Sequence, residues 1–403
     1  MSKPIAPGEG ETPDATATND AKPEDKILSA DGQGVPANHQ NTRIAIDAMG
    51  GDLGPEVVLD GAVRAIERGL SRPLVFVGPK AQLDALIAER PKLSQATVND
   101  APDTVPMDAK PSQILRRGEN TSMWRAIELQ RKNQCAAVLS CGNTGALMAL
   151  SYKLLGVVEG IERPAISALW PSPKGRVVVL DVGATVDITD KQLVQFAIMG
   201  EAFFRTLTGV KKPTVGLLNV GAEEGKGREM IRVAAATLKE RCKEMSFHGF
   251  VEGNDISMGS VNVVVTDGFS GNIALKSAEG AAKLVGQWLR EALTRSWWSK
   301  LCALALAPAL SGLKAQMDPS SVNGGVFLGI DGTVVKSHGG ADAEGVASAI
   351  LMAANLADHP FQDEIATTVA AALGQISAPK PTAIRPSQSD AKSHDGDTVE
   401  ATA

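Results

Sequence analysis

The chain has 403 residues, of which 43% are hydrophobic, 21% charged and 4% aromatic, enough apolar material for one large or two ordinary soluble domains. Its 40 basic and 46 acidic side chains give a formal net charge of -6, which argues against a nucleic-acid-binding protein recruited by bulk positive charge. No cysteine lies in a Cys-x-x-Cys pair or beside histidines, so the sequence predicts neither a metal site nor a disulfide framework. A reducing, cytoplasmic compartment is the expectation.

Residues 1–42 and 377–403 contain many small, acidic and proline residues and few large apolar side chains. Such segments bury too little apolar surface to offset the entropy of ordering, so we expect two disordered tails around a folded domain at residues 43–376. The sequence has no secretory signal pattern at its start and no uninterrupted run of about 18 apolar residues. Neither export nor membrane spanning is therefore expected.

Between the tails, short β-branched runs alternate with helical patterns; the runs lie at residues 43–47, 73–78, 136–140, 177–181, 215–219 and 261–267. Strands buried on both faces have this composition, so the sequence predicts an α/β fold with a mostly parallel sheet. Five of the predicted strands end in a polar residue shortly before a glycine: Asp47, Ser140, Asp181, Asn219 and Asp267. Because ligands bind at the carboxyl ends of strands in such sheets, we expect these loops to line one cleft.

Two of the glycine-rich loops are candidates for anion binding. The first precedes a predicted helix and contains Asp47, Gly50, Gly51 and Asp52. Glycines let backbone N–H groups approach an anion, and a helix N-terminus adds positive potential; a tight turn with an aspartate cap is the alternative. The second follows a strand and contains Gly142, Asn143, Thr144 and Gly145. It predicts a compact nest for phosphate or an oxyanion, with a purely structural turn as the alternative.

Two further loops contain side chains suited to proton transfer and orientation. Lys336 and His338 follow another apparent strand, where lysine offers a charge for phosphate and histidine titrates near neutral pH. A structural histidine is the alternative. Asp267 and Asn272 flank two glycines, with a helix cap as the alternative. No dinucleotide fingerprint or P-loop occurs, although the Asp181 segment weakly resembles the phosphate loop of actin-like ATPases.

Taken in order, these loops resemble the bacterial phosphate acyltransferase family (PlsX). The resemblance runs from Ile44 to about Leu356, through IDAMGGDLGPE, SCGNTGALMA, LDVGATVD, LLNVGAEEGKG, FVEGNDI, VTDGFSGNIALK and VFLGIDGTVVKSHGGAD. It implies a three-layer α/β/α fold related to isopropylmalate dehydrogenase and phosphotransacetylase, usually as a homodimer. It also implies transfer of a fatty acyl group from acyl carrier protein thioester to inorganic phosphate, without a cofactor, upstream of the membrane-bound glycerol 3-phosphate acyltransferase in phosphatidic acid synthesis.

In that reaction phosphate is itself the nucleophile, so the enzyme must supply an anion site, oxyanion donors and a proton for the leaving thiolate. Our hypothesis places phosphate against Gly142–Gly145 and Lys336. It assigns His338 to proton transfer or oxyanion donation and gives Asp267 and Asn272 an orienting role. Asp181 and the Asp47–Asp52 loop complete the predicted substrate site. Two alternatives stay open, an actin-like ATPase or sugar kinase and a non-catalytic membrane-bound scaffold for lipid enzymes.

Acyl carrier protein is strongly acidic, so a basic docking surface is expected. Over residues 228–245 a helical period places four basic side chains in a stripe roughly 60° wide: Arg228, Arg232, Lys239 and Lys243. The apolar residues at 231, 235, 238, 242 and 245 fall in the adjoining arc and are expected to face the core. An ordinary solvated face is the alternative.

Residues 293–317 read LTRSWWSKLCALALAPALSGLKAQM, with basic residues near a tryptophan pair and no acidic residue. Tryptophan and basic side chains together favour the membrane interface, and Pro308 with Gly312 would break the segment into a projecting amphipathic hairpin. The sequence thus predicts reversible, peripheral contact with the anionic inner face of the cell membrane, made by Trp297, Trp298, Leu301, Leu304 and Leu306. A buried core helix is the alternative.

Overall fold

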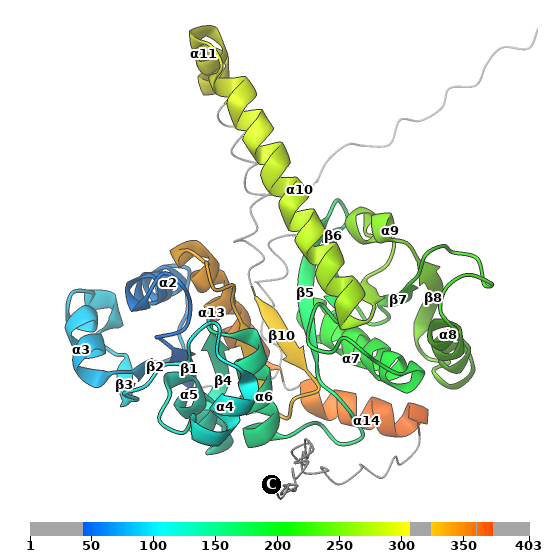
Figure 1. Cartoon of the computed structure of the whole chain (residues 1–403), viewed down its shortest axis with the longest axis horizontal. Coiled ribbons are helices and arrows are strands. Elements are labelled where there is room, and N and C mark those ends of the chain that lie inside the picture. Colours follow the sequence, from blue (N-terminus) through cyan, green and yellow to red (C-terminus); the bar gives the residue numbers. More distant parts are fainter. Residues whose placement is uncertain (1–42, 307–323, 360, 374–403) are drawn as a thin grey trace, which may run out of the picture.

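The computed structural model describes residues 43–306, 324–359 and 361–373, and its centre is one twisted sheet (Figure 1). The order of the eleven strands is β3-β2-β1-β4-β11-β10-β5-β6-β9-β7-β8. Their bounds are β1 Arg43–Asp47, β2 Leu74–Gly78, β3 Thr97–Asp100, β4 Cys135–Ser140, β5 Ala165–Ser172, β6 Gly175–Leu180, β7 Thr214–Leu218, β8 Ser246–Val251, β9 Val263–Val265, β10 Gly325–Leu328 and β11 Thr333–Lys336.

Successive strand residues alternate between two buried clusters, one on each face of the sheet. Ile44 and Ile46 of β1 belong to the first cluster and Ala45 to the second, which explains why the central strands are apolar throughout. The first cluster is covered by α2 Pro55–Glu67, α3 Lys80–Ala88, α7 Asp190–Thr208, α8 Glu229–Arg241, α13 Ala343–Asp358 and α14 Phe361–Leu373. The second is covered by α4 Pro111–Arg117, α5 Ser122–Arg131, α6 Thr144–Leu155, α9 Gly253–Met258 and the start of α10 Gly268–Thr294. The predicted three-layer α/β/α architecture is confirmed.

The direction of the strands reverses near the middle of the sheet. β11 pairs antiparallel with β10, β10 with β5, and β5 with β6, whereas the strands on either side of this block pair in parallel. Three reversals leave β6, β9 and β7 pointing opposite to β1, β4 and β11. The antiparallel pairs therefore separate the five polar strand ends into two sets at opposite edges of the sheet, and the expectation that their loops line one cleft stays a prediction.

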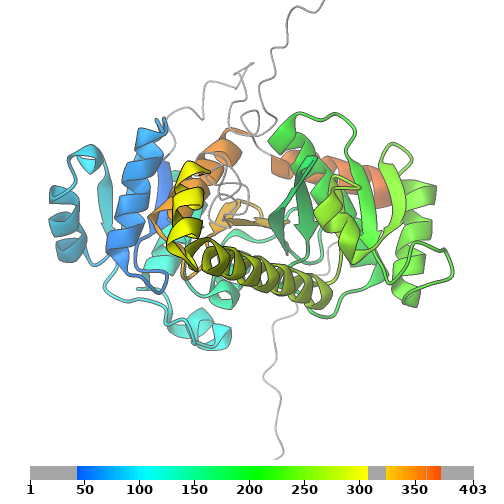
Figure 2. The ribbon, with the colours of Figure 1, turned by 90° about the horizontal axis from the view of Figure 1, so that it is seen from above.

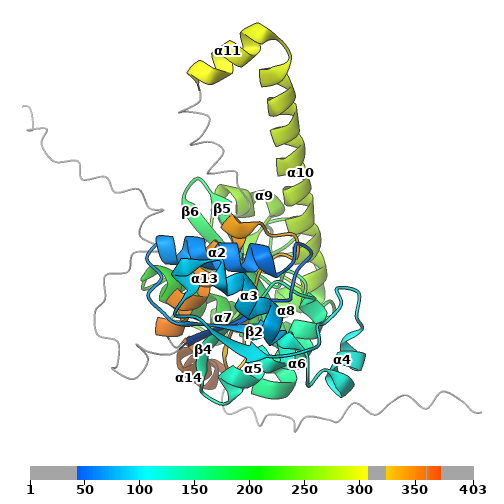
Figure 3. The ribbon, with the colours of Figure 1, turned by 90° about the vertical axis from the view of Figure 1, so that its left-hand side faces the viewer.

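Helix α10 leaves the body of the molecule and carries α11 Trp297–Ala305 across its far end (Figures 1 and 3). Ala274, Leu275 and Ala278 pack against the second core cluster, and the rest of α10 projects. Seen from above, the projection lies over the space between the two halves of the sheet (Figure 2). The projection thus begins within α10 rather than at residue 293.

The described part of the projecting segment ends at residue 306, so the predicted break at Pro308 and Gly312 lies outside the described residues, as do the two predicted tails. Trp297 and Trp298 are 63% and 60% exposed, which contradicts the alternative of a buried core helix. None of the described helices has the length and apolar character needed to cross a bilayer.

Candidate active site

The first set of predicted residues lies on three neighbouring parallel strands. Asp47 at the end of β1 is paired in register with Ser140 at the end of β4, and Ser140 with Lys336 at the end of β11. Carboxyl ends of parallel strands meet at one edge of a sheet, so a carboxylate, a hydroxyl and an ammonium group are placed side by side. The sheet itself therefore assembles this part of the site.

Asp47 and Ser140 are connected by a buried hydrogen-bond chain. Ser140 Oγ donates to Asp47 Oδ2 at 2.7 Å and accepts from the Gly142 N–H at 3.0 Å. Burial raises the pKa of Asp47, while the hydroxyls of Ser122 and Ser140 act in the opposite direction. Asp47 Oδ1 nevertheless has no hydrogen bond of acceptable geometry within the described residues. This carboxyl is thus fixed beside the Gly142 loop with one acceptor unused.

The glycines in these loops allow close backbone contact. A Cβ atom at Gly50 would lie 2.7 Å from the Gly142 nitrogen, which is too close for any side chain. Gly51 has a φ of +98°, and a Cβ there would lie 3.0 Å from the Gly339 carbonyl oxygen. The Asp52 N–H donates to that same carbonyl at 2.8 Å. The loops after β1, β4 and β11 therefore pack into one unit.

Lys336 is a buried cation within this unit. Its side chain donates to the carbonyl oxygens of Cys141, at 3.4 Å, and of Ser337. Burial lowers the pKa of Lys336 to about 8, even though Asp52 and Asp47 lie near enough to raise it. Lys336 is consequently a buried cation whose pKa lies closer to physiological pH than that of an exposed lysine.

His338 lies at the exposed rim of the same unit. Its Nδ1 accepts the Gly340 N–H at 3.0 Å, which assigns the proton of the neutral ring to Nε2. Partial burial and the positive charge of Lys276 lower the pKa of His338, so the ring is mainly neutral at pH 7. Lys276 belongs to α10, so the charge of this helix acts on a residue of the first set.

Asn143 and its neighbours form the turn into α6. The Asn143 amide donates to the carbonyls of Met107, at 2.7 Å, and Ala109, at 3.1 Å, while its oxygen caps the helix by accepting from Ala146 N–H. Asn143 therefore acts as a positioning residue in this structure. Thr144 and Gly145 are exposed in the first turn of α6, where unpaired N–H groups and the helix dipole favour an anion.

The second set surrounds the start of α10, at the ends of β6 and β9. Asp181 is fully buried and accepts N–H groups from Ile166, Gly183, Ala184 and Thr185. Burial raises its pKa and the backbone donors oppose that shift. With both oxygens occupied by the backbone, the geometry favours a loop-positioning role over direct phosphate contact.

The Asp267 carboxylate caps α10, because it accepts hydrogen bonds from the Ser270 N–H at 2.8 Å and from the Ser270 hydroxyl at 2.9 Å. Asp267 Oδ2 also lies 3.8 Å from a guanidinium nitrogen of Arg228. Asn272 is exposed one turn later, beside Gly183. The helix-cap alternative for Asp267 is thus realised. Both sets follow the carboxyl ends of strands, but these strands run in opposite directions, and α10 begins at the second set.

The predicted basic stripe lies on and beside α8. The core-facing half of that prediction is confirmed, because Ala235, Leu238, Cys242 and Met245 are buried. Three of the basic side chains form internal ion pairs: Arg228 with Asp267 at 3.8 Å, Arg232 with Glu229, and Lys239 with Glu224 at 2.8 Å. Lys243 lies beyond the end of the helix. Much of the charge on this stripe is therefore compensated within the chain.

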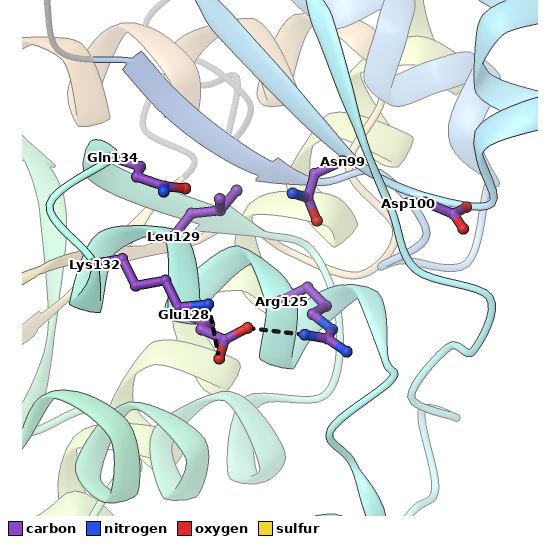
Figure 4. Close-up of a pocket in the computed structure, with 7 residues that line it drawn as sticks. All are labelled: Asn99, Asp100, Arg125, Glu128, Leu129, Lys132 and Gln134. Carbon is purple, nitrogen blue, oxygen red and sulfur yellow. Dashed lines mark hydrogen bonds and ion pairs between the residues drawn. The ribbon is translucent and has the colours of Figure 1, made fainter.

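A separate pocket lies between β3 and α5 (Figure 4), lined by Asn99, Asp100, Arg125, Glu128, Leu129, Lys132 and Gln134. Glu128 pairs with Arg125 at 3.0 Å and with Lys132 at 3.3 Å. No predicted site residue contributes to its wall. In the described part of the chain, no three His, Cys, Asp or Glu side chains are grouped to hold a metal ion.

Two polar residues of the site, Ser337 and Lys276, were missing from the predicted set, and Ser140 was predicted only as the end of a strand whose loop lines the cleft. Ser140 ended a predicted strand and Ser337 stood between two candidates, so position alone pointed to both. Lys276 is distant in sequence and gave no signal, because its place beside His338 depends on how α10 crosses the sheet.

Solved structures identify the fold. A phosphotransacetylase from Staphylococcus aureus superimposes with a TM-score of 0.52 at 14% identity, over 83% of this chain and 98% of that one. A phosphotransacetylase from Streptococcus pyogenes gives the same TM-score at 16% identity, over 83% and 96% of the two chains. The protein is thus an α/β protein with the phosphotransacetylase fold.

Sequence relatives are much closer. The phosphate acyltransferase of Rhizobium leguminosarum bv. trifolii is 49% identical over 326 residues, 80% of this chain and 94% of the relative. That of Paracoccus denitrificans is 47% identical over 354 residues, 86% and 96% of the two chains. The sequence model described as "Fatty acid synthesis protein" matches residues 42–364. The chain belongs to this family, PlsX, and is a phosphate acyltransferase of fatty acid and phospholipid synthesis.

Proposed function

We propose that the protein transfers a fatty acyl group from acyl carrier protein thioester to inorganic phosphate and releases acyl phosphate. The observation that carries this proposal is the in-register row of Asp47, Ser140 and Lys336 beside the first turn of α6. A buried ammonium and a helix N-terminus together suit a small dianion. The identity to phosphate acyltransferases supports the same reaction class.

In the proposed reaction a phosphate oxygen attacks the thioester carbonyl, the C–S bond breaks, and the thiolate takes up a proton. Phosphate lies against Gly142–Gly145 and Lys336, which hold it in position for attack. His338 Nε2–H donates a hydrogen bond to the oxyanion, because Nδ1 is occupied by Gly340. The proton that the thiolate takes up is the one that the attacking hydrogen phosphate loses. Asp267, Asn272 and Asp181 order the start of α10 and the loop that contacts it.

The reaction is tested with purified protein, acyl carrier protein thioester and inorganic phosphate. Acyl phosphate is trapped as a hydroxamate, and the released carrier thiol is titrated. Hydroxamate and thiol should form in equal amounts, and neither should form when phosphate is absent. Consumption of ATP without acyl phosphate would instead support a kinase or ATPase. Membrane binding without either product would support a scaffold.

We further propose a homodimer that associates peripherally with anionic membranes on the cytoplasmic side and passes acyl phosphate to a glycerol 3-phosphate acyltransferase. Exposed Leu284, Val285, Trp288 and Leu289 on α10 offer an apolar surface for a second copy. At the tip, Trp297 and Trp298 stack with ring centroids 3.6 Å apart, next to exposed Leu306. The side chains of Leu301 and Leu304 lie outside the described residues. Trp288→Glu should halve the mass measured by sedimentation equilibrium.

A further inference from the structure

Helix α10 carries a line of basic side chains at seven-residue spacing, Lys276, Lys283 and Arg290. At 100° per residue, seven residues fall about 20° short of two full turns, so the three side chains leave the helix on nearly the same side. Fourteen residues cover about 21 Å of helix. The line is therefore long enough for several simultaneous ion pairs with one partner.

Most of this charge is not compensated by the protein. All three residues are exposed. Lys276 pairs with Glu279 at 2.8 Å, whereas neither Lys283 nor Arg290 has a carboxylate partner within the residues that the structure describes. The basic line thus differs from the α8 stripe, where Arg232 and Lys239 are each paired with a glutamate.

The line begins beside the candidate active site. The positive charges of Lys276 and Lys283 act together with partial burial to lower the pKa of His338, and Lys276 also affects Lys336. Asn272, one turn before Lys276, lies on the same side of α10. The first residue of the line is therefore the one whose charge acts on both His338 and Lys336.

The apolar residues of α10 lie on the other side of the helix. Val285 and Trp288 are about 140–160° from Lys283 around the axis, and they are 48% and 59% exposed. If a second copy of the chain covers this apolar surface, the basic line stays open to solvent. Figure 3 shows the free length of α10 between the body and α11.

We propose that Lys276, Lys283 and Arg290 form the docking line for the acidic acyl carrier protein, and that the carrier lies along α10 while its thioester arm enters the site. This inference rests on the proposed function and names the surface that the donor uses. Charge complementarity supports it, because an acidic partner gains attraction and orientation from a row of cations, two of which have no carboxylate partner among the described residues. A lipid surface fits less well, since the line starts at the first turns of α10 whereas the exposed pair Trp297 and Trp298 lies in α11 at the tip.

The test uses the full-length protein with two donors of the same acyl chain, one linked to carrier protein and one to pantetheine alone. Lys283→Glu with Arg290→Glu should raise the Michaelis constant for the carrier-linked donor about a hundredfold, roughly tenfold for each reversed charge, and flatten its salt dependence. The pantetheine thioester makes no contact with the line, so it should be used as well as by the wild type when each protein is assayed at a pH above the pKa of its His338.

Arg295→Glu is the matched control, since it reverses one charge on the same helix about 140° from Arg290. Arg232→Glu with Lys239→Glu tests the α8 stripe in the same assay. The proposal would be overturned if the Lys283/Arg290 variant and the wild type had equal kinetics with the carrier-linked donor. It would also be overturned if the variant lost the same activity with both donors, or if it lost only vesicle binding. A wild type that makes acyl phosphate from neither donor would contradict the proposed function itself.

Discussion

At the scale of single residues, Lys336 is a buried cation whose pKa lies well below that of an exposed lysine. It has two carbonyl acceptors and no carboxylate contact among the described residues, so its charge is held in the protein without a direct ion pair. Such an arrangement favours an incoming anion, because phosphate would supply the missing charge.

Lys336→Met keeps most of the side-chain volume and removes the charge. We expect the Michaelis constant for phosphate at pH 7 to rise by about tenfold or more, the worth of a charge-assisted hydrogen bond. In the wild type this constant should increase as pH rises through about 8, where Lys336 loses its proton, and the variant should lack that step. Initial rates against phosphate concentration from pH 6.5 to 9.5 measure both.

Lys336→Met should weaken phosphate binding but increase the stability of the folded protein. The pKa of Lys336 falls from 10.5 in the unfolded chain to about 8, so the unfolded state binds more protons between these values and stability rises with pH in that window. The destabilising effect of the buried charge is complete below pH 8. Lys336→Met should therefore unfold at higher urea concentration than the wild type at pH 7. A variant with weaker phosphate binding and lower stability would contradict the description of Lys336 as a destabilising buried charge.

Ser140→Ala tests the buried hydrogen-bond chain. Both the Asp47 carboxylate and the Gly142 N–H lose a partner, which should lower the free energy of unfolding by about 1–3 kcal/mol and reduce kcat/KM for phosphate. Ser151 is the matched control, because its buried hydroxyl has no partner within the described residues. Urea unfolding of both variants should show a large loss only for Ser140→Ala; equal losses would mean that the chain contributes nothing specific.

At the scale of elements, the start of α10 depends on close backbone packing. A Cβ at Gly271 would lie 2.0 Å from the Asp181 carbonyl oxygen, and one at Gly268 would lie 2.6 Å from that of Thr185. Only glycine allows the helix to approach the Asp181 loop this closely. The same element then carries the basic line and the tip, so its angle at the first turn sets where both lie.

Gly271→Ala should therefore displace α10 and lower the free energy of unfolding by about 1–3 kcal/mol, with a loss of carrier-dependent activity. Gly280→Ala, in the same helix, meets no atom within 4 Å and should stabilise by about 0.5–1 kcal/mol through helix propensity. Chemical unfolding of the pair provides the measurement. If Gly271→Ala were as well tolerated as Gly280→Ala, the close contact would not matter for the fold.

At the scale of the whole molecule, the structure separates a compact body from a projecting arm with exposed tryptophans at its end (Figures 1 and 3). Such an arm allows a membrane to be contacted without moving the candidate site into it. Aromatic and basic side chains at the tip suit the headgroup region.

Wild-type protein should float with vesicles rich in anionic phospholipid, and Trp298→Glu with Leu306→Glu should reduce the floated fraction several-fold. The pantetheine-donor activity of the variant should stay unchanged. Val210→Glu changes an exposed apolar residue of the body, 42% exposed, and should float like the wild type. Flotation of all three proteins to the same extent would show that the tip is not the anchor.

The sequence by itself determined the fold class, most of the strands around the site and the reaction class. Ile44 to Asp47 and residues 136–140 are read as strands because their apolar side chains must be buried on both sides of a sheet, a local property of the chain. The motifs likewise identified the family. The basic and apolar sides of α8 followed from helical period alone.

Only the tertiary structure decided which loops meet. The antiparallel pairing of β10 and β5 splits the polar strand ends into two sets, and pairing partners so far apart in sequence leave no local signal. The low pKa of Lys336, the saturation of Asp181 by backbone donors and the approach of Lys276 to His338 all depend on burial and on the path of α10. These properties arise from packing between distant segments, which is why composition and period could not supply them.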